Sequence, residues 1–203
     1  MFGGGVGCLV CRSCAVGTRR QTCSRAAPSP PRDGVIHALY GGVYGKEHGV
    51  LDGHPRTGPL LRPLVQMGPA AACGIHVHSG WGFGSDGRGD LFACSFNLRT
   101  VSRHRLVPNG ATFTTVDEPF VTGDAADFHP TDVIEDADGS LLIVDTGGWY
   151  KLCCPTSQLE KPAVLGAIYR IRNRATATVH DPRGQRIDWR RLDAAGLARL
   201  LAD

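Results

Sequence analysis

A tight Asp138-Gly139 turn between two short apolar runs constrains the fold of this chain more than any other feature. The runs are residues 131–135 and 141–145, and a hairpin turn of this kind needs the positive φ that glycine accepts. A third run, residues 167–172, follows a long insertion. A unit of three strands buries one face and leaves pairing edges open, so it needs neighbours. The pattern therefore predicts one blade of a β-propeller.

Further apolar runs, separated by turn residues, precede this unit, and the chain holds 27 glycines and 13 prolines. That composition suits many short strands better than long helices. Residues 70–121 can supply a whole four-stranded blade, whereas a closed propeller needs at least about four blades. We therefore predict a mostly β chain that forms a partial β-propeller of about two blades. The strands expected before the hairpin are residues 35–44, 60–66, 73–78, 91–96, 100–107 and 111–116.

The two ends of the chain differ from this propeller part, residues 33–174. Residues 1–32 combine glycines, four cysteines and five arginines with a proline-rich end, so we expect disorder or a head foreign to the fold. The spacing of Cys8, Cys11 and Cys14 also allows a small metal-binding knob, although no second pair follows at matching spacing. In residues 175–203 we expect a linker and then the first helix of a truncated helical repeat, because Asp193 can cap apolar residues at helical spacing.

Charge argues against one class of function. The net charge of +3 depends on the five arginines of residues 1–32, because 17 basic and 19 acidic residues remain elsewhere. The rest of the chain gives no reason to expect nucleic-acid binding. No stretch reaches the roughly 18–20 apolar residues that span a bilayer, and the first residues lack the pattern of a signal peptide.

Two motifs carry a family resemblance: residues 127–133, Asp-Phe-His-Pro-Thr-Asp-Val, and residues 145–159, Asp-Thr-Gly-Gly-Trp-Tyr-Lys-Leu-Cys-Cys-Pro-Thr-Ser-Gln-Leu. With them, the chain from about residue 33 onward resembles the bacterial membrane-bound dehydrogenase family. The propeller of that family is similar to the glucose/sorbosone dehydrogenases, which are quinoproteins, and a HEAT-repeat array often follows it. The resemblance implies that this chain is the last blades plus the first helix of that array. Shorter matching stretches are residues 40–45, 68–71, 89–94, 96–98 and 110–113.

The resemblance implies oxidation of a small sugar or alcohol with pyrroloquinoline quinone and calcium, by a periplasmic or membrane-associated protein. The family's catalytic histidine and most of its calcium ligands belong to earlier blades. The catalytic base is therefore expected outside this chain, and the missing propeller blades are the expected partners. Three cofactor-contacting positions, a lysine and two arginines in the soluble enzymes, align with Asn97, His129 and Thr131. Lysine and arginine hold the cofactor's carboxylates through charge-assisted bonds, whereas Asn97 and Thr131 offer only neutral ones.

Five residues near strand ends form the best candidate cluster: His129, Asp132, Asp145, Trp149 and Lys151. Strand ends and the loops after them are where propellers present ligand groups, and an aromatic ring can stack on a sugar. The alternative is a blade-to-blade hydrogen-bond network that anchors the insertion at residues 146–165. Two further hypotheses compete with the enzyme: a non-catalytic propeller scaffold for ligand or protein binding, and a truncated reading frame without a function of its own.

Four cysteines of the propeller part are disulfide candidates: Cys73, Cys94, Cys153 and Cys154. Adjacent cysteines bridge each other only in a strained ring, so partners elsewhere in the fold are favoured for the last two. Either a structural disulfide or buried free thiols fit this pattern, and no general base stands beside them for a catalytic thiol.

Two other patterns suggest metals but have simpler explanations. His76 and His78 share one strand face, as in metal sites that His104 could complete, but without a fixed third ligand they are better explained as partly exposed strand histidines. Residues 136–139 resemble the start of a calcium loop, but the glutamate required at the twelfth position is missing. A β-turn built on aspartate and glycine explains them better.

Overall fold

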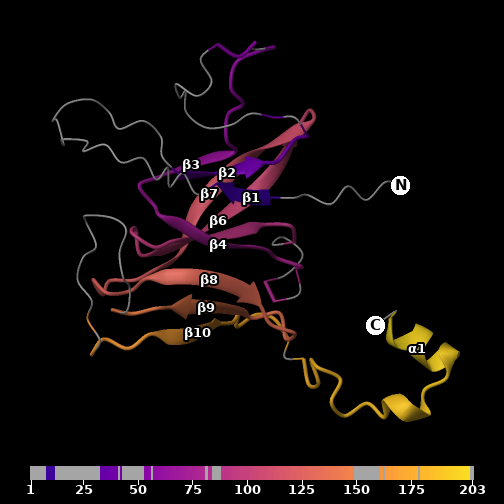
Figure 1. Ribbon diagram of the computed structural model, residues 1–203. Helices are drawn as coiled ribbons and strands as arrows, with labels where there is room; N and C mark the ends of the chain where they lie inside the picture. Colours follow the sequence, from indigo (N-terminus) through magenta and orange to yellow (C-terminus); the bar gives the residue numbers. More distant parts are fainter. Residues whose placement is uncertain are drawn as a thin grey trace.

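The computed structural model describes residues 8–11, 33–40, 42, 53–55, 57–80, 82–83, 88–148, 161, 163–177 and 179–201. Within these residues the chain is mostly β, as predicted, and its strands form three antiparallel sheets (Figure 1). The elements are β1 (Cys8–Cys11), β2 (Asp33–His37), β3 (Val65–Gly68), β4 (Ala72–Val77), β5 (Leu91–Ser95), β6 (Thr100–Asn109), β7 (Thr112–Thr122), β8 (Pro130–Glu135), β9 (Leu141–Asp145), β10 (Ala167–Ile171), a 3₁₀ turn at Trp189–Arg191 and α1 (Ala194–Leu200).

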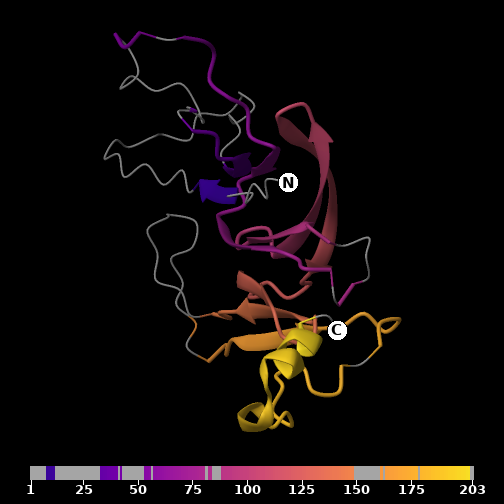
Figure 2. The ribbon, with the colours of Figure 1, turned by 90° about the vertical axis from the view of Figure 1, so that its right-hand side faces the viewer.

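The three sheets lie in layers, with the four-stranded sheet β4-β5-β6-β7 in the middle (Figure 1). The sheet β1-β2-β3 lies on one side of it and the sheet β10-β9-β8 on the other. Figure 2 shows that the long β6–β7 hairpin continues beyond the middle layer alongside the first sheet. The arrangement is that of a partial propeller, in which each blade packs its face against the next.

The middle position of β5 explains its composition, because all five of its residues are buried. Side chains alternate across a strand, so Phe92 and Cys94 point to one face and Leu91 and Ala93 to the other. The first face joins Val101 in a core cluster with apolar residues of the third sheet, Val133, Leu141 and Ile143 among them. A strand that is apolar on both faces is what a layer between two others requires.

Strands β4 and β8 belong to different sheets but lie side by side and run in the same direction. A Cβ atom at Gly74 of β4 would come within 2.5 Å of the Asp132 Cα of β8, so glycine is needed for this approach. Further along both strands, the Ser79 N–H donates to Glu135 Oε2 over 2.7 Å. The ends of two successive blades therefore meet, and polar groups that follow β4 and β8 come together.

The Asp138-Gly139 hairpin was predicted correctly. β8 and β9 pair antiparallel, Gly139 has a φ of 74°, and the Asp136 N–H donates to Ser140 O over 2.8 Å. Asp138 accepts hydrogen bonds from the Ser140 N–H and hydroxyl. The Ser140 hydroxyl bond is the main reason that the pKa of Asp138 lies well below its usual range, and Arg172 lowers it further. The turn residues are thus paired within the chain, which agrees with the β-turn and not with a calcium loop.

The bounds of some other strands differ from the predicted ones for local reasons. Residues 35–44 were expected to form a strand and a bend; the strand ends at His37, and the Gly42 N–H closes a turn on Leu39 O. The strand expected over residues 60–66 begins only at Val65, after Pro63, which has no N–H for a ladder. The hairpin of β6 and β7 reaches Thr122, because the polar run at residues 117–119 continues the strand instead of ending it.

The predictions for the two ends of the chain also had different outcomes. We expected no regular structure in residues 1–32, but Cys8–Cys11 forms β1 and pairs with β2 from Cys8 opposite His37 to Cys11 opposite Gly34. Backbone pairing with a neighbouring strand overrides the composition there. At the other end, Asp193 caps α1 as predicted and accepts a hydrogen bond from the Gly196 N–H over 2.7 Å. Figure 1 shows the tail leading away from the sheets to α1.

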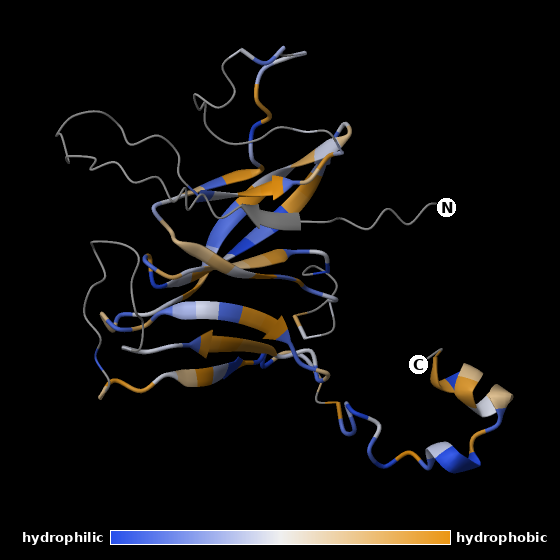
Figure 3. Cartoon of the chain, viewed as in Figure 1, coloured by the Kyte–Doolittle hydropathy of each residue, from blue (hydrophilic) through white to orange (hydrophobic). Residues whose placement is uncertain are grey.

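The outer face of the third sheet is open. Ile134 pairs with Leu142 and Ile168 with Val144, which places all four side chains on the face turned away from the middle sheet. Ile134 is 46% exposed and Ile168 68%, and Figure 3 shows that most of β9 is hydrophobic. No helix among the residues described is long and apolar enough to cross a membrane.

Candidate functional site

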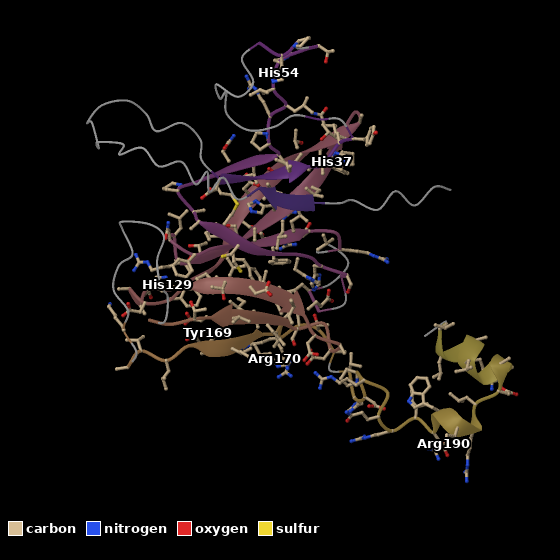
Figure 4. All side chains as sticks on the ribbon, viewed as in Figure 1. His37, His54, His129, Tyr169, Arg170 and Arg190 are labelled. Atoms are coloured by element: carbon tan, nitrogen blue, oxygen red, sulfur yellow. The ribbon has the colours of Figure 1, made fainter. Side chains whose placement is uncertain are left out.

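Two of the three predicted cofactor positions lie at one end of the blades. His129 precedes β8, and its ring stacks on Phe96 with the ring centroids 4.3 Å apart and the planes 8° from parallel. Its Nδ1 lies 3.4 Å from Phe96 O. Phe96 and Asn97 form the turn between β5 and β6, so the structure brings His129 next to the turn that carries Asn97 (Figure 4 labels His129).

The side chains at these positions are poorly suited to anchor an anionic cofactor. The exposed Asn97 amide makes only a long contact of 3.5 Å to Pro69 O, while its backbone N–H donates to Ala70 O over 2.9 Å. The Thr131 hydroxyl donates to Val144 O over 3.2 Å. None of the three positions presents a permanent positive charge, and one hydroxyl is already used inside the sheet.

Asp145 anchors the backbone at the same end. It is 8% exposed, and its Oδ1 accepts hydrogen bonds from the His129 N–H and the Gly147 N–H, each over 2.9 Å. Gly147 has a φ of 59°, which favours glycine. Asp145 therefore ties the segment before β8 to the turn after β9, within one sheet.

Asp132 does not join Asp145. A register shift between Pro130 and Asp132 pairs Asp132 with Val144, so the Asp132 and Asp145 side chains point to opposite faces of the sheet. Asp132 instead accepts a hydrogen bond from the Val133 N–H over 2.9 Å and lies against Gly74. The two other members of the predicted cluster, Trp149 and Lys151, lie outside the residues described.

The other end of β4 and β8 carries a carboxylate that the sequence did not reveal, which is Glu135. Its Oε2 lies 3.5 Å from His76 Nε2 and its Oε1 lies 3.5 Å from His78 Nε2. Ser79 adds two short hydrogen bonds to the same carboxylate, 2.7 Å from its N–H and 2.6 Å from its hydroxyl. We refer to Glu135, His76, His78 and Ser79 as the Glu135 cluster. The sequence offered one signal for this contact, a strand that ends in a glutamate and could lie parallel to the strand of His76. That signal can be interpreted only when the pairing of the blades is known.

Protonation in the Glu135 cluster follows from its contacts. The Gly80 N–H, which can only donate, lies 3.0 Å from His78 Nδ1, so the proton of the neutral ring resides on Nε2 and faces Glu135. Burial alone would raise the pKa of Glu135, but the two hydrogen bonds from Ser79, the nearby His78 and the His76 contact lower it below its ordinary value. The carboxylate is therefore ionised at neutral pH, with donors directed at both oxygens.

A pocket with a volume of about 480 Å³ opens beside this cluster, between the ends of β4 and β8 and the tail. His76 and Glu135 line one side, and Val179, Asp181 and Pro182 line another. The tail is held there by the Arg183–Asp136 ion pair at 2.8 Å. Two carboxylates of the lining, Asp136 and Asp181, are engaged by arginines or by backbone N–H groups.

The proposed histidine trio is separated in space. His76 and His78 contact Glu135, whereas the His104 Nδ1 lies 2.9 Å from Asp117 Oδ1 on β7. Within the described part of the chain, no group of three His, Cys, Asp or Glu side chains is placed to hold a metal ion. The calcium suggested by the family resemblance therefore has no ligand set among these residues.

Two cysteines of the propeller part, Cys73 and Cys94, lie beside each other. Cys94 is a free thiol with no exposed surface, and burial raises its pKa strongly, with Cys73 and Asp132 adding to the effect. The Cys73 Sγ donates to Pro130 O over 3.2 Å. The structure thus has thiols at these two positions and no disulfide between them, with Cys94 buried and Cys73 half-buried. Cys153 and Cys154 lie outside the described residues.

Comparison with known proteins gives one family. A family model described as "Domain of unknown function (DUF7133)" matches residues 61–175, which is more than half of the chain. No curated protein and no solved structure matches. The matched region begins just before β3 and ends just after β10, so it includes both the Glu135 cluster and the predicted cofactor positions.

Proposed function

The chain belongs to the DUF7133 family, and from that premise we propose that it supplies blades to the propeller of a quinoprotein-like dehydrogenase that oxidises small sugars or alcohols. One observation carries the proposal: β4 and β8 lie side by side and parallel, as the inner strands of successive blades do. The motifs at residues 127–133 and 145–159, which resemble those of the dehydrogenase family, support the proposal.

Further blades complete the protein on this proposal. The open face of the third sheet, with Ile134 and Ile168 exposed, suits burial by another sheet of the same kind. Burial of apolar area contributes about 25 cal/mol per Å², so a blade that covers this face stabilises the whole ring. A helical repeat beginning at α1 and a periplasmic or membrane-associated location are parts of the same proposal.

The described residues fit a supporting role better than a cofactor-holding role. Asn97, His129 and Thr131 offer no permanent cation for the carboxylates of pyrroloquinoline quinone, and Thr131 is engaged with Val144 O. The quinone does not fit these residues, and no catalytic step is derived through it. The role we assign to this chain is to fix the blade ends that face the ligand, through Asp145 at one end and Glu135 at the other.

A non-catalytic propeller scaffold is the second candidate. It is favoured by the same lack of cationic groups at Asn97 and Thr131, because a recognition scaffold needs no quinone anchors. It shares the fold and the open face with the first candidate and differs from it only in chemistry.

Activity of the natural protein that contains this chain separates the two. We expect dye reduction with calcium, pyrroloquinoline quinone and at least one member of a panel of sugars and alcohols, and quinone binding by calorimetry. The Asn97→Ala variant should bind the quinone within about twofold of the wild type, since one exposed neutral amide contributes little. Absence of both dye reduction and quinone binding would reject the dehydrogenase and leave the scaffold.

A further inference from the structure

The middle and third sheets start from the same place but contain different numbers of strands. Strands β4 and β8 lie side by side, and each is the first strand of its sheet in the chain. The middle sheet continues through β5 and β6 to β7, whereas the third sheet continues through β9 and ends at β10. Strand β10 therefore occupies the position of β6, and among the described residues no strand lies beside it in the position of β7 (Figure 1).

Solvent exposure distinguishes β10 from β6. None of the first five residues of β6, which has β7 on its second edge, is exposed, whereas three of the five residues of β10 are exposed. Ile168 is 68% exposed and Tyr169 46%. The two side chains point to opposite faces, because Ile168 pairs with Val144 and the Tyr169 ring packs on Phe128 with the centroids 6.0 Å apart. A sheet laid over the outer face would cover Ile168 alone, but a strand added at the edge would cover both side chains.

The sequence of β10 lacks the usual protection of an outermost strand. Exposed edges are commonly protected by proline or by free charged side chains, which oppose pairing with a further strand. β7 contains Pro119, a residue that sheets place on edge strands or at bulges. β10 contains no proline, and three of its five residues are isoleucine or tyrosine, which favour strands. Its one charged residue, Arg170, is paired with Asp136 at 2.7 Å (Figure 4 labels Arg170). This composition suits a strand that is paired on both edges.

The residues that follow β10 do not supply the missing strand. A two-residue turn at residues 110–111 folds β7 directly back along β6. After β10, in contrast, the Thr176 hydroxyl donates to Gly82 O over 2.9 Å, in the segment after β4. Arg183 then pairs with Asp136 at 2.8 Å, between β8 and β9. No strand follows β10 in the described part of the tail, so a strand at this edge has to come from another part of a sequence.

We propose that the free edge of β10 pairs with a fourth strand, which a distant segment of the same natural polypeptide supplies. The strand runs antiparallel to β10, as β7 does to β6, and presents apolar side chains to Ile168 on one face and to Tyr169 on the other. β10 is five residues long, so the added ladder is short, and a strand from a separate molecule would also lose its free translation and rotation. A tethered segment avoids this loss, because its effective concentration is high. The inference rests on the propeller part of the proposed function and not on its oxidation chemistry.

Hydrogen exchange of the natural protein, resolved to single amides, tests the proposal. An edge strand bonds only every second N–H to its neighbour, whereas a strand inside a sheet has all of them bonded. β6 and β7 are internal references for these two cases, because β6 has a neighbour on both edges and β7 on one. We expect the amides of residues 168–171 to be protected without alternation, within about tenfold of those of β6. Alternating fast and slow exchange along β10, as expected for β7, would overturn the proposal.

Two parallel measurements on the same sample identify the source of the strand and separate this inference from the dehydrogenase. Sedimentation gives the oligomeric state, and protection of every β10 amide in the monomer supports a strand of the same polypeptide. A protected β10 found only in a dimer would assign the strand to a second copy and overturn the proposal. Dye reduction reports the chemistry independently. A free β10 edge in an active protein rejects the fourth strand alone, whereas a protected β10 in a protein without activity or quinone binding rejects the dehydrogenase alone.

Discussion

The Glu135 cluster and the His104–Asp117 pair are built from the same residue types but differ in what they leave open. Glu135 receives two hydrogen bonds from Ser79 and faces the Nε2 atoms of His76 and His78. Asp117 engages a single ring nitrogen, and the Nε2 of His104 makes no hydrogen bond within the described residues, a state that the Nε2 atoms of His76 and His78 share at 3.5 Å from Glu135. The comparison shows that two histidine–carboxylate contacts differ in how the carboxylate is held, by two donors of Ser79 in one case and by a single ring nitrogen in the other.

The position of each site in the fold explains this difference. Glu135 ends an inner strand and holds together segments of two blades, since Ser79 follows β4 and Glu135 ends β8. His104 and Asp117 lie opposite each other within one sheet, where the ladder already holds the strands. The first site thus joins segments of two blades, whereas the second lies within a single sheet.

The largest expected effect is that of Glu135→Ala, which removes the carboxylate that joins β8 to the segment after β4. It leaves the Ser79 hydroxyl and N–H without their acceptor and removes the carboxylate that faces two imidazoles, so we expect a loss of about 2–4 kcal/mol in the free energy of unfolding. Denaturant unfolding of the natural protein measures it. A loss below about 0.5 kcal/mol would remove the distinction between the two sites.

Acid should weaken the same contacts between Glu135 and its neighbours Ser79, His76 and His78. Because the folded-state pKa of Glu135 is lower than its ordinary value of 4.5, the unfolded chain takes up this proton first as pH falls. The stability that Glu135 contributes is complete above that value and is lost as pH drops through the folded-state pKa. Thermal melts between about pH 6 and pH 3 should show this loss, and Glu135→Gln should flatten it. An equally steep decline in Glu135→Gln would assign acid sensitivity to other carboxylates.

Asp117→Ala should have a smaller effect on stability and a clear one on protonation. Asp117 is 43% exposed at its side chain, so we expect a loss of about 1 kcal/mol. The neutral His104 ring should no longer favour Nδ1–H, which its ¹⁵N shifts report. Unchanged shifts would mean that Asp117 does not set the tautomer.

The smallest effect is expected for Glu118→Ala, which serves as the matched control beside Asp117. Its partner is Arg103 in an ion pair at 3.2 Å, and its side chain is 47% exposed. Exposed pairs of this kind contribute about 0–1 kcal/mol. The ¹⁵N shifts of His104 should match those of the wild type. A change in them would show that the Glu118 charge affects the His104 tautomer without a direct hydrogen bond to the ring.

Local patterns predicted most strands but not the contacts between sheets. The Asp138-Gly139 turn and the apolar alternation around it identify β8 and β9, and residues 91–96 identify β5, because these signals act within a few residues. The strand at Cys8–Cys11 was missed, since it depends on pairing with β2 and not on its own composition.

The candidate site was harder to predict than the strands, because its contacts join residues that lie far apart in the sequence. His76 and His78 were recognised as a pair on one face, but Glu135 comes from a strand that lies far away in the sequence. Asp145 and Asp132 were expected to stand together, yet Asp132 points to the other face because of a register shift that no local signal shows. His104 was considered only as a third metal ligand, because its partner Asp117 becomes visible only with the register of β6 and β7.

The tautomers of His78 and His104 test the central comparison most directly. Long-range proton–nitrogen correlation of the ¹⁵N-histidine protein, recorded with both rings in their neutral form, reads both tautomers in one spectrum. We predict Nε2–H with a bare Nδ1 for His78, and Nδ1–H with a bare Nε2 for His104. The same tautomer in both rings, or an Nε2–H in His104, would contradict the account.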